Sequence, residues 1–153
     1  QIMQIETSRF GSVEIDDSRI TQFPKGLVGF PHCVRFALMQ TNDEGVFFWL
    51  QSVERAELAF VVCDPRVFVP DYRIPIKGED LELIGLESPD DAQVLVIVNK
   101  VDNMLTGNLQ GPLVINARSL TGAQLVLSDK RYTTRYPLIS LDRRERVAMS
   151  KTA

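Results

Sequence analysis

The sequence has little of what enzymes, membrane proteins and metal-binding proteins usually need. Its 153 residues include one histidine, His32, and two cysteines, Cys33 and Cys63. No apolar run approaches the roughly 20 residues that span a bilayer. No basic segment followed by an apolar one marks the N-terminal region for export. We therefore expect a soluble, cytoplasmic protein with no membrane partner.

A basic excess is also missing. The chain has 20 acidic and 17 basic residues and a net charge of -3, which disfavours non-specific attraction to phosphate backbones. An RNA-binding β-barrel would need a basic face with aromatic platforms. Basic residues form a cluster only near the C-terminus, at Arg143, Arg144 and Arg146. Nucleic acid is therefore not expected as a direct partner.

The candidates for catalysis and metal binding are few. His32 and Cys33 are adjacent, so on a strand their side chains point apart, and they are not spaced as a chelating pair. A single disulfide would be unusual in a cytosolic domain, and we expect both cysteines to be buried small hydrophobes. Asp64 and Asp71 each sit beside a proline, where aspartate commonly accepts hydrogen bonds from turn amides. We expect no enzyme, no metal and no cofactor.

Many short apolar segments are separated by proline and glycine turns, which favours an all-β protein. A change of period with Glu79 and Asp80 at its start predicts one short helix at 79–86. We predict a compact single domain, an antiparallel β-barrel or sandwich, over residues 3–139. Residues 140–153 then form a charged, flexible tail. The predicted strands cover residues 3–7, 13–15, 19–23, 34–40, 46–52, 58–63, 93–101, 113–117, 122–127 and 132–139.

The stretch 58–72 joins a fully apolar strand to a rigid corner. Residues 58–63 are apolar at every position, as in a strand buried on both faces, and Asp64-Pro65 ends it. Pro70-Asp71-Tyr72 repeats the corner and leads into an extended segment, 72–76. We expect Pro70, Asp71 and Tyr72 to lie at the surface beside a partner site, since tyrosine is enriched in binding hot spots. The alternative is that Tyr72 caps the barrel.

Two aromatic stretches have a structural interpretation. Phe47 and Trp49 share one face of a strand and Phe48 takes the other, and we expect both sets to be covered. Residues 23–30 carry two glycines three apart, but no lysine and helix follow as a phosphate-binding loop requires. This stretch is predicted to be a tight turn whose phenylalanines plug one end of the barrel. The proline in 132–139 argues for an edge strand.

Six short motifs occur in order over residues 3–139: FPxGLxGF at 23–30, LQS at 50–52, DPxxFxPDY at 64–72, NLxxPLxIN at 108–116, GxQ at 122–124 and YxxRxPL at 132–138. Together these motifs resemble the flagellar assembly factor FliW family. The resemblance implies a barrel-like protein without enzymatic activity that binds two proteins, flagellin and the translational regulator CsrA. Binding would shield flagellin before export and would prevent CsrA from repressing flagellin mRNA. The motif residues taken as candidate partner contacts are Phe68, Pro70, Asp71, Tyr72, Asn108, Tyr132 and Arg135.

A different class of function remains open. The same aromatic residues would suit a β-barrel that binds a small ligand or cofactor in a pocket closed by Phe23, Phe30 and Trp49. Such a protein would carry a bound small molecule that native mass spectrometry detects.

Overall fold

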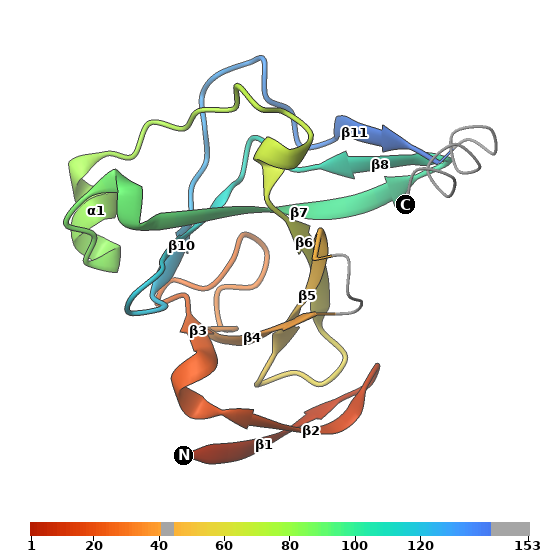
Figure 1. Ribbon diagram of the computed structural model, residues 1–153, viewed down its shortest axis with the longest axis vertical. Coiled ribbons are helices and arrows are strands. Elements are labelled where there is room, and N and C mark those ends of the chain that lie inside the picture. Colours follow the sequence, from red (N-terminus) through yellow and green to blue (C-terminus); the bar gives the residue numbers. More distant parts are fainter. Residues whose placement is uncertain (41–44, 142–153) are drawn as a thin grey trace.

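The structure, a computed structural model, describes residues 1–40 and 45–141. Within that part, strands hold most of the regular structure, and α1 (Gly78–Ile84) is the one α-helix. All pairs of neighbouring strands are antiparallel (Figure 1). The all-β prediction with one short helix is confirmed. The strands are β1 (Ile2–Thr7), β2 (Gly11–Asp16), β3 (Ile20–Gln22), β4 (Arg35–Gln40), β5 (Phe47–Ser52), β6 (Ala59–Cys63), β7 (Ala92–Val101), β8 (Met104–Gly107), β9 (Leu113–Asn116), β10 (Gly122–Gln124) and β11 (Tyr136–Ser140).

One sheet of nine strands forms the body of the molecule. Its order is β10-β9-β7-β6-β5-β4-β3, with β8 added to β7 and β11 added to β8. The two ends of this order meet through a single parallel bridge, between Gln22 and Thr121. One bridge is not a ladder, so the fold is sandwich-like and not a closed barrel. The strand β11 pairs only with β8 and has a register shift after Pro137, which confirms the predicted edge position.

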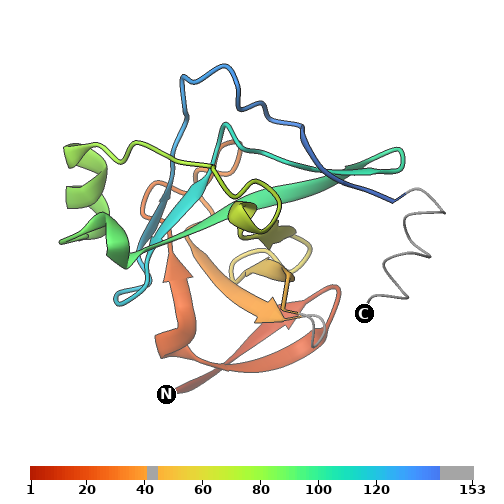
Figure 2. The same ribbon diagram turned by 45° about the horizontal axis from the view of Figure 1, so that its top comes forward.

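The β1–β2 hairpin is a separate two-stranded sheet. Its register runs from Ile2 opposite Asp16 to Thr7 opposite Gly11, which confirms the strands predicted at 3–7 and 13–15. It lies along one side of the body, below β3 and β4 in Figure 1 and Figure 2. Ile5 packs there against Ile20 and Ala37. The hairpin therefore adds a small third cluster to the two larger cores.

The two larger cores lie on opposite faces of β7. Val94, Val96 and Val98 belong to the first core, whereas Leu95 and Ile97 pack into the second. Side chains alternate between the faces of a strand. This explains why β7 is apolar at successive positions.

The helix α1 covers the first core, where Ile84 is buried. Glu79 and Asp80 lie in its first turn, where carboxylates stabilise the positive end of the helix dipole. It ends at Gly85, whose φ of 68° lies in the left-handed region that glycine adopts without strain. The side chain of Asn116 donates to the carbonyls of Ile84 and Gly85 at 3.0 and 3.2 Å. The helix prediction at 79–86 is thus confirmed, with small differences at both ends.

The aromatic and cysteine predictions also hold. Phe47 packs on the first core and Phe48 on the second, while the Trp49 ring is covered by the Arg9 guanidinium at 4.0 Å. Both cysteines are free and buried. Burial, with a smaller contribution from neighbouring Asp64, raises the pKa of the Cys63 thiol to about 12.

The stretch 23–30 is a tight turn, as predicted. The backbone groups of Leu27 and Phe30 bond to each other, and Gly26 has a φ of 68°. A side chain at Gly26 would also meet the Phe30 carbonyl oxygen at 2.5 Å. Phe23 is fully buried at the base of this turn.

Three sequence expectations fail or remain predictions. The extended segment predicted at 72–76 forms no strand, and β8 was missed because its four residues follow a two-residue turn at the end of β7. Residues 142–153, with Arg143, Arg144 and Arg146, lie outside the described residues. The boundary between a domain at 3–139 and a flexible tail therefore stays a prediction.

Candidate partner-binding surface

The corner after β6 is built by its own side chains. The Asp64 carboxylate accepts the Arg66 amide at 2.9 Å, and Pro65 opens the short 3-10 turn η2 (Pro65–Val67). The Val69 amide then donates to the Pro65 carbonyl, and the Tyr72 amide to the Val69 carbonyl. Two successive turns thus reverse the chain where the prolines predict corners.

Tyr72 is buried, which corrects the expectation that the corner exposes it. Its side chain is 1% exposed, and its hydroxyl donates to the Leu109 carbonyl at 2.6 Å. Its ring meets that of Tyr132 edge-on, with centroids 4.8 Å apart. Burial is the main cause of a raised pKa for the Tyr72 phenol. A buried tyrosine needs a partner for its hydroxyl, and Leu109 supplies one, so Tyr72 caps the core from inside.

Tyr132 and Asn108 also have structural roles. Tyr132 is 7% exposed and belongs to the same core as Tyr72. Asn108 is half-buried, and its side-chain oxygen accepts the Gly111 amide at 2.9 Å. The amides of Leu109 and Gln110 both donate to the Thr133 carbonyl. These bonds join the segments around Asn108 and Tyr132, which lie far apart in the sequence.

The other four candidates lie nearer to solvent. Phe68 is half-buried and stacks on Phe47 with centroids 5.9 Å apart, while Pro70, Asp71 and Arg135 are exposed. The structure thus brings Tyr72 and Tyr132 into contact and places Phe68 beside the same core. Within the described residues, no hydrogen bond, ion pair or ring contact joins Arg135 to the other candidates.

Two exposed cations beside the corner were missed by the sequence analysis. Arg73 donates to the carbonyls of Pro70 and Tyr72. The Arg131 guanidinium lies 5.3 Å from the centroid of the Tyr132 ring and forms a 2.7 Å ion pair with Asp129. The hydrogen bond to Asp129 is the largest cause of a raised Arg131 pKa, and the charge of Asp71 adds to it. The spacing of Asp129 and Arg131, which suits a turn, was the available signal.

We call Pro70, Asp71, Arg73 and Arg131 the corner surface. All four are exposed. Arg131 lies over the ring of Tyr132, and the other three are close to Tyr72 in the sequence. Charges of both signs over a rigid aromatic base suit contact with another protein. Among the described residues, no three His, Cys, Asp or Glu side chains gather as a metal site. No described helix has the length and apolar character needed to cross a membrane.

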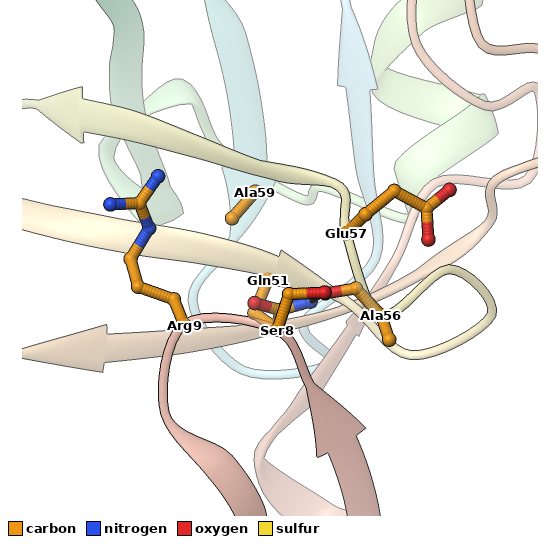
Figure 3. A pocket seen from close by; sticks show the side chains of 6 residues that line it. All are labelled: Ser8, Arg9, Gln51, Ala56, Glu57 and Ala59. Carbon is orange, nitrogen blue, oxygen red and sulfur yellow. Dashed lines mark hydrogen bonds between the residues drawn. The ribbon is translucent and has the colours of Figure 1, made fainter.

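A hollow lies between the tip of the β1–β2 hairpin and the β5–β6 turn, apart from the corner surface. It has a volume of about 280 Å³, and Figure 3 shows the six residues that line it: Ser8, Arg9, Gln51, Ala56, Glu57 and Ala59. The Gln51 amide nitrogen donates to the carbonyls of Ser52, Ala56 and Leu58 at 3.1 to 3.2 Å. These bonds explain the buried glutamine as a brace for the turn. Its side-chain oxygen is buried, with no hydrogen-bond partner among the described residues.

The aromatic residues proposed to close a ligand pocket do not come together. Phe23 packs against Phe36 at 5.7 Å in the second core, and Phe30 against Phe60 at 5.5 Å. Trp49 instead meets Phe10 of the hairpin tip at 6.2 Å. Phe23 and Phe30 thus lie in the second core, linked through the contact between Phe36 and Phe60 at 6.4 Å, whereas Trp49 lies apart from them. The three residues therefore do not close one pocket.

Comparison with known proteins gives the family. The model of the FliW protein family matches residues 4–138. The chain belongs to the FliW family. A flagellar assembly factor FliW from Treponema denticola is 39% identical over 140 residues, covering 90% of this chain and 95% of the relative. The factor from Natranaerobius thermophilus is 38% identical, covering 90% and 93%.

Other FliW proteins agree over similar lengths. The factor from Geobacter sulfurreducens is 33% identical over 153 residues and covers 99% of this chain and 96% of its own. A crystal structure of the flagellar assembly factor FliW superimposes with a TM-score of 0.82 at 32% identity. It covers 92% of this chain and 99% of the solved one. The chain is therefore a member of a family of flagellar assembly factors, with the FliW fold.

Proposed function

We propose that this chain is a non-enzymatic, cytoplasmic protein that binds flagellin and the translational regulator CsrA. Bound flagellin is kept from aggregating before export, and bound CsrA cannot repress flagellin mRNA. The single observation that carries the proposal is membership of the FliW family. The net charge of -3 agrees with it, because an acidic protein is attracted to a basic RNA-binding regulator and repels RNA.

The corner surface is the part of the chain that we assign to partner contact. It offers exposed charges on a rigid base, and it contains two of the seven motif candidates, Pro70 and Asp71. We also propose Arg135 and the half-buried Phe68 as residues that contact a partner. Tyr72, Asn108 and Tyr132 then act as supports, because their side chains serve the core and its turns.

A pair of charge reversals tests this assignment. Asp71→Lys changes the corner surface, and Glu14→Lys makes the same exposed change on the distant β2. We expect Asp71→Lys to weaken binding of purified flagellin or of CsrA by roughly fivefold to tenfold, as for the loss of about 1–1.4 kcal/mol. Glu14→Lys should leave both affinities unchanged. Equal effects of the two variants would rule out the corner surface as the contact.

We propose as a hypothesis that the two partners compete for this protein. A stable complex usually covers about 800 Å² on each protein, less than a tenth of the accessible surface of 9461 Å², so two such footprints either fit side by side or overlap. If flagellin lowers the affinity for CsrA, CsrA must lower the affinity for flagellin by the same factor. Accumulated flagellin would then release CsrA and reduce flagellin translation.

To test this competition, labelled CsrA bound to this protein is titrated with flagellin, and the titration is repeated in the opposite order. A ternary complex with both affinities unchanged would overturn the competition.

A further inference from the structure

The backbone beyond β10 leaves a strand edge open. The amides of Leu125 and Leu127 continue the β9–β10 ladder by donating to the carbonyls of Pro112 and Gln110. Backbone groups alternate between the two edges of a strand, so those of Val126 and Ser128 point to the opposite edge. Within the described part of the chain, neither residue has a hydrogen-bond partner.

The same edge is covered up to Gln124. The bridge between Gln22 and Thr121 occupies its beginning. Further along, the turn at 23–30 reaches Gln124, whose side-chain oxygen accepts the Val28 amide at 2.8 Å. After Gln124 no described segment bonds to this edge. An added strand would therefore begin just after Gln124, where the turn at 23–30 stops covering the edge.

The open part is also apolar on its outer face. Leu125 and Leu127 are buried, but Val126 is 73% exposed and Val28 is 67% exposed. Gln124 and Val126 share a face of the extended chain, so Val28, held by Gln124, lies on the face of Val126. Natural proteins usually protect such edges with charges, prolines or bulges. Residues 124–127, with the sequence QLVL, carry no charge and no proline.

An acidic wall lies beside this edge. A groove of about 220 Å³ separates residues 124–128 from the start of α1, and Glu79 and Asp80 line it with Lys77 and Pro75. Neither carboxylate has an ion-pair partner among the described residues. Charge complementarity therefore favours a basic occupant over a second copy of this chain, which itself carries a net charge of -3.

We propose that residues 124–128 bind an extended, basic segment of a partner protein by strand addition. The backbone of the segment bonds to Val126 and Ser128, an apolar side chain covers Val126, and a lysine or arginine reaches Glu79 or Asp80. In this mode backbone bonds supply affinity and side-chain contacts supply specificity. The inference goes beyond the function proposed above and holds whichever protein supplies the segment.

Val126→Pro is the direct test, because it removes an amide hydrogen that makes no internal bond. Val126→Thr is the matched control, since it keeps that hydrogen and the branched shape. The probe is a fluorescent peptide of about seven residues in which threonine and valine alternate between two terminal lysines. Its binding is followed by anisotropy, and amide hydrogen exchange is followed on the protein. Circular dichroism and Tm measurements check that both variants fold.

We expect the peptide to protect the amides of Val126 and Ser128 in the wild-type protein. Val126→Pro should weaken binding about tenfold, the loss of roughly 1.4 kcal/mol that one or two backbone bonds supply. Val126→Thr should bind as the wild type does. Glu79→Gln with Asp80→Asn should weaken binding and reduce its salt dependence. A peptide with glutamates in place of lysines should bind more weakly.

Three results would overturn the proposal. The first is the absence of binding or protection at peptide concentrations up to about 1 mM. The second is equal binding of the basic and acidic peptides. The third is a wild-type dimer in sedimentation equilibrium that Val126→Pro dissociates, because a second copy would then occupy the edge. Flagellin binding measured on the same samples tests the proposed function separately, since either activity can be lost without the other.

Discussion

Tyr72 belongs to the first core, and Val126 lies between two residues of that core, Leu125 and Leu127, but Tyr72 is 1% exposed and Val126 is 73% exposed. At the corner the chain turns twice, and every polar group of Tyr72 finds a partner inside the protein. After β10 the chain stays extended, so alternate residues must face outward. Charged residues protect the corner surface, whereas the edge at 124–128 has none. A tyrosine in a polar motif is thus buried, and a valine in an apolar run is left in solvent.

The largest effect that separates the two regions is expected at Tyr72. Tyr72→Ala should destabilise the fold by about 3–5 kcal/mol, because it leaves a cavity beside Tyr132 and an unpaired Leu109 carbonyl. Tyr72→Phe should cost only about 1–2 kcal/mol, since it removes the hydroxyl alone. Urea unfolding measures both values. Val126→Ala is the control on the open edge and should change stability by less than about 0.5 kcal/mol. Similar losses for Tyr72→Ala and Val126→Ala would break the contrast.

The next largest effect is a loss of stability at alkaline pH, caused by the Cys63 thiol at the end of β6, just before the corner. The Cys63 thiol has a pKa raised to about 12 in the folded protein, from an ordinary value of 9.0, mainly by burial. A raised pKa means that the stabilisation is fully present below about pH 9 and is lost as the pH rises toward 12. Cys63→Ala lacks this group, so the stability difference between wild type and variant should shrink over that range. Chemical unfolding at several pH values measures it. A constant difference would show that the thiol does not titrate with unfolding.

The sequence predicts these two regions unequally well, for physical reasons. The apolar run of β7 and the prolines after β6 act locally, so the strand and the corner could be predicted from them. The burial of Tyr72 depends on Leu109 and Tyr132, which lie more than 35 residues away, and no local pattern reveals such a partner. The strand predicted at 122–127 is shorter in the structure, where β10 ends at Gln124, and the open edge beyond it was not predicted. Whether an edge is covered depends on where the turn at 23–30 ends.

Substitution of Gln124 is expected to have an intermediate effect on stability. Gln124 is the residue at which the covered part of the edge ends. Its side chain accepts the Val28 amide and donates to the Gly111 carbonyl at 3.0 Å, so it ties two turns to the end of β10. Gln124→Ala should lower stability by about 1–2 kcal/mol. It should also speed amide exchange at Val28 more than at Leu125, whose bond to Pro112 remains. Gln124→Glu keeps the acceptor but loses the donor, and should leave Val28 protected. Fast exchange at Val28 in both variants would show that the acceptor does not hold the turn.

The smallest effect is expected at Arg131 on the corner surface. Its ion pair with Asp129 is exposed, and exposed pairs contribute little to stability at neutral pH. Arg131→Ala should therefore leave Tm almost unchanged at pH 7. The hydrogen bond from Arg131 is the largest cause of the lowered Asp129 pKa. A lowered carboxylate pKa stabilises the fold above the ordinary value of 3.8 and is lost as the pH falls through the folded pKa. Below that range the stabilities of wild type and Arg131→Ala should converge. In an Asp129→Asn background, Arg131→Ala should cause no difference in stability at any pH.

If Arg131→Ala weakens flagellin or CsrA binding while Tm at pH 7 stays constant, the residue serves contact and not folding. A matching loss of Tm would reverse that assignment.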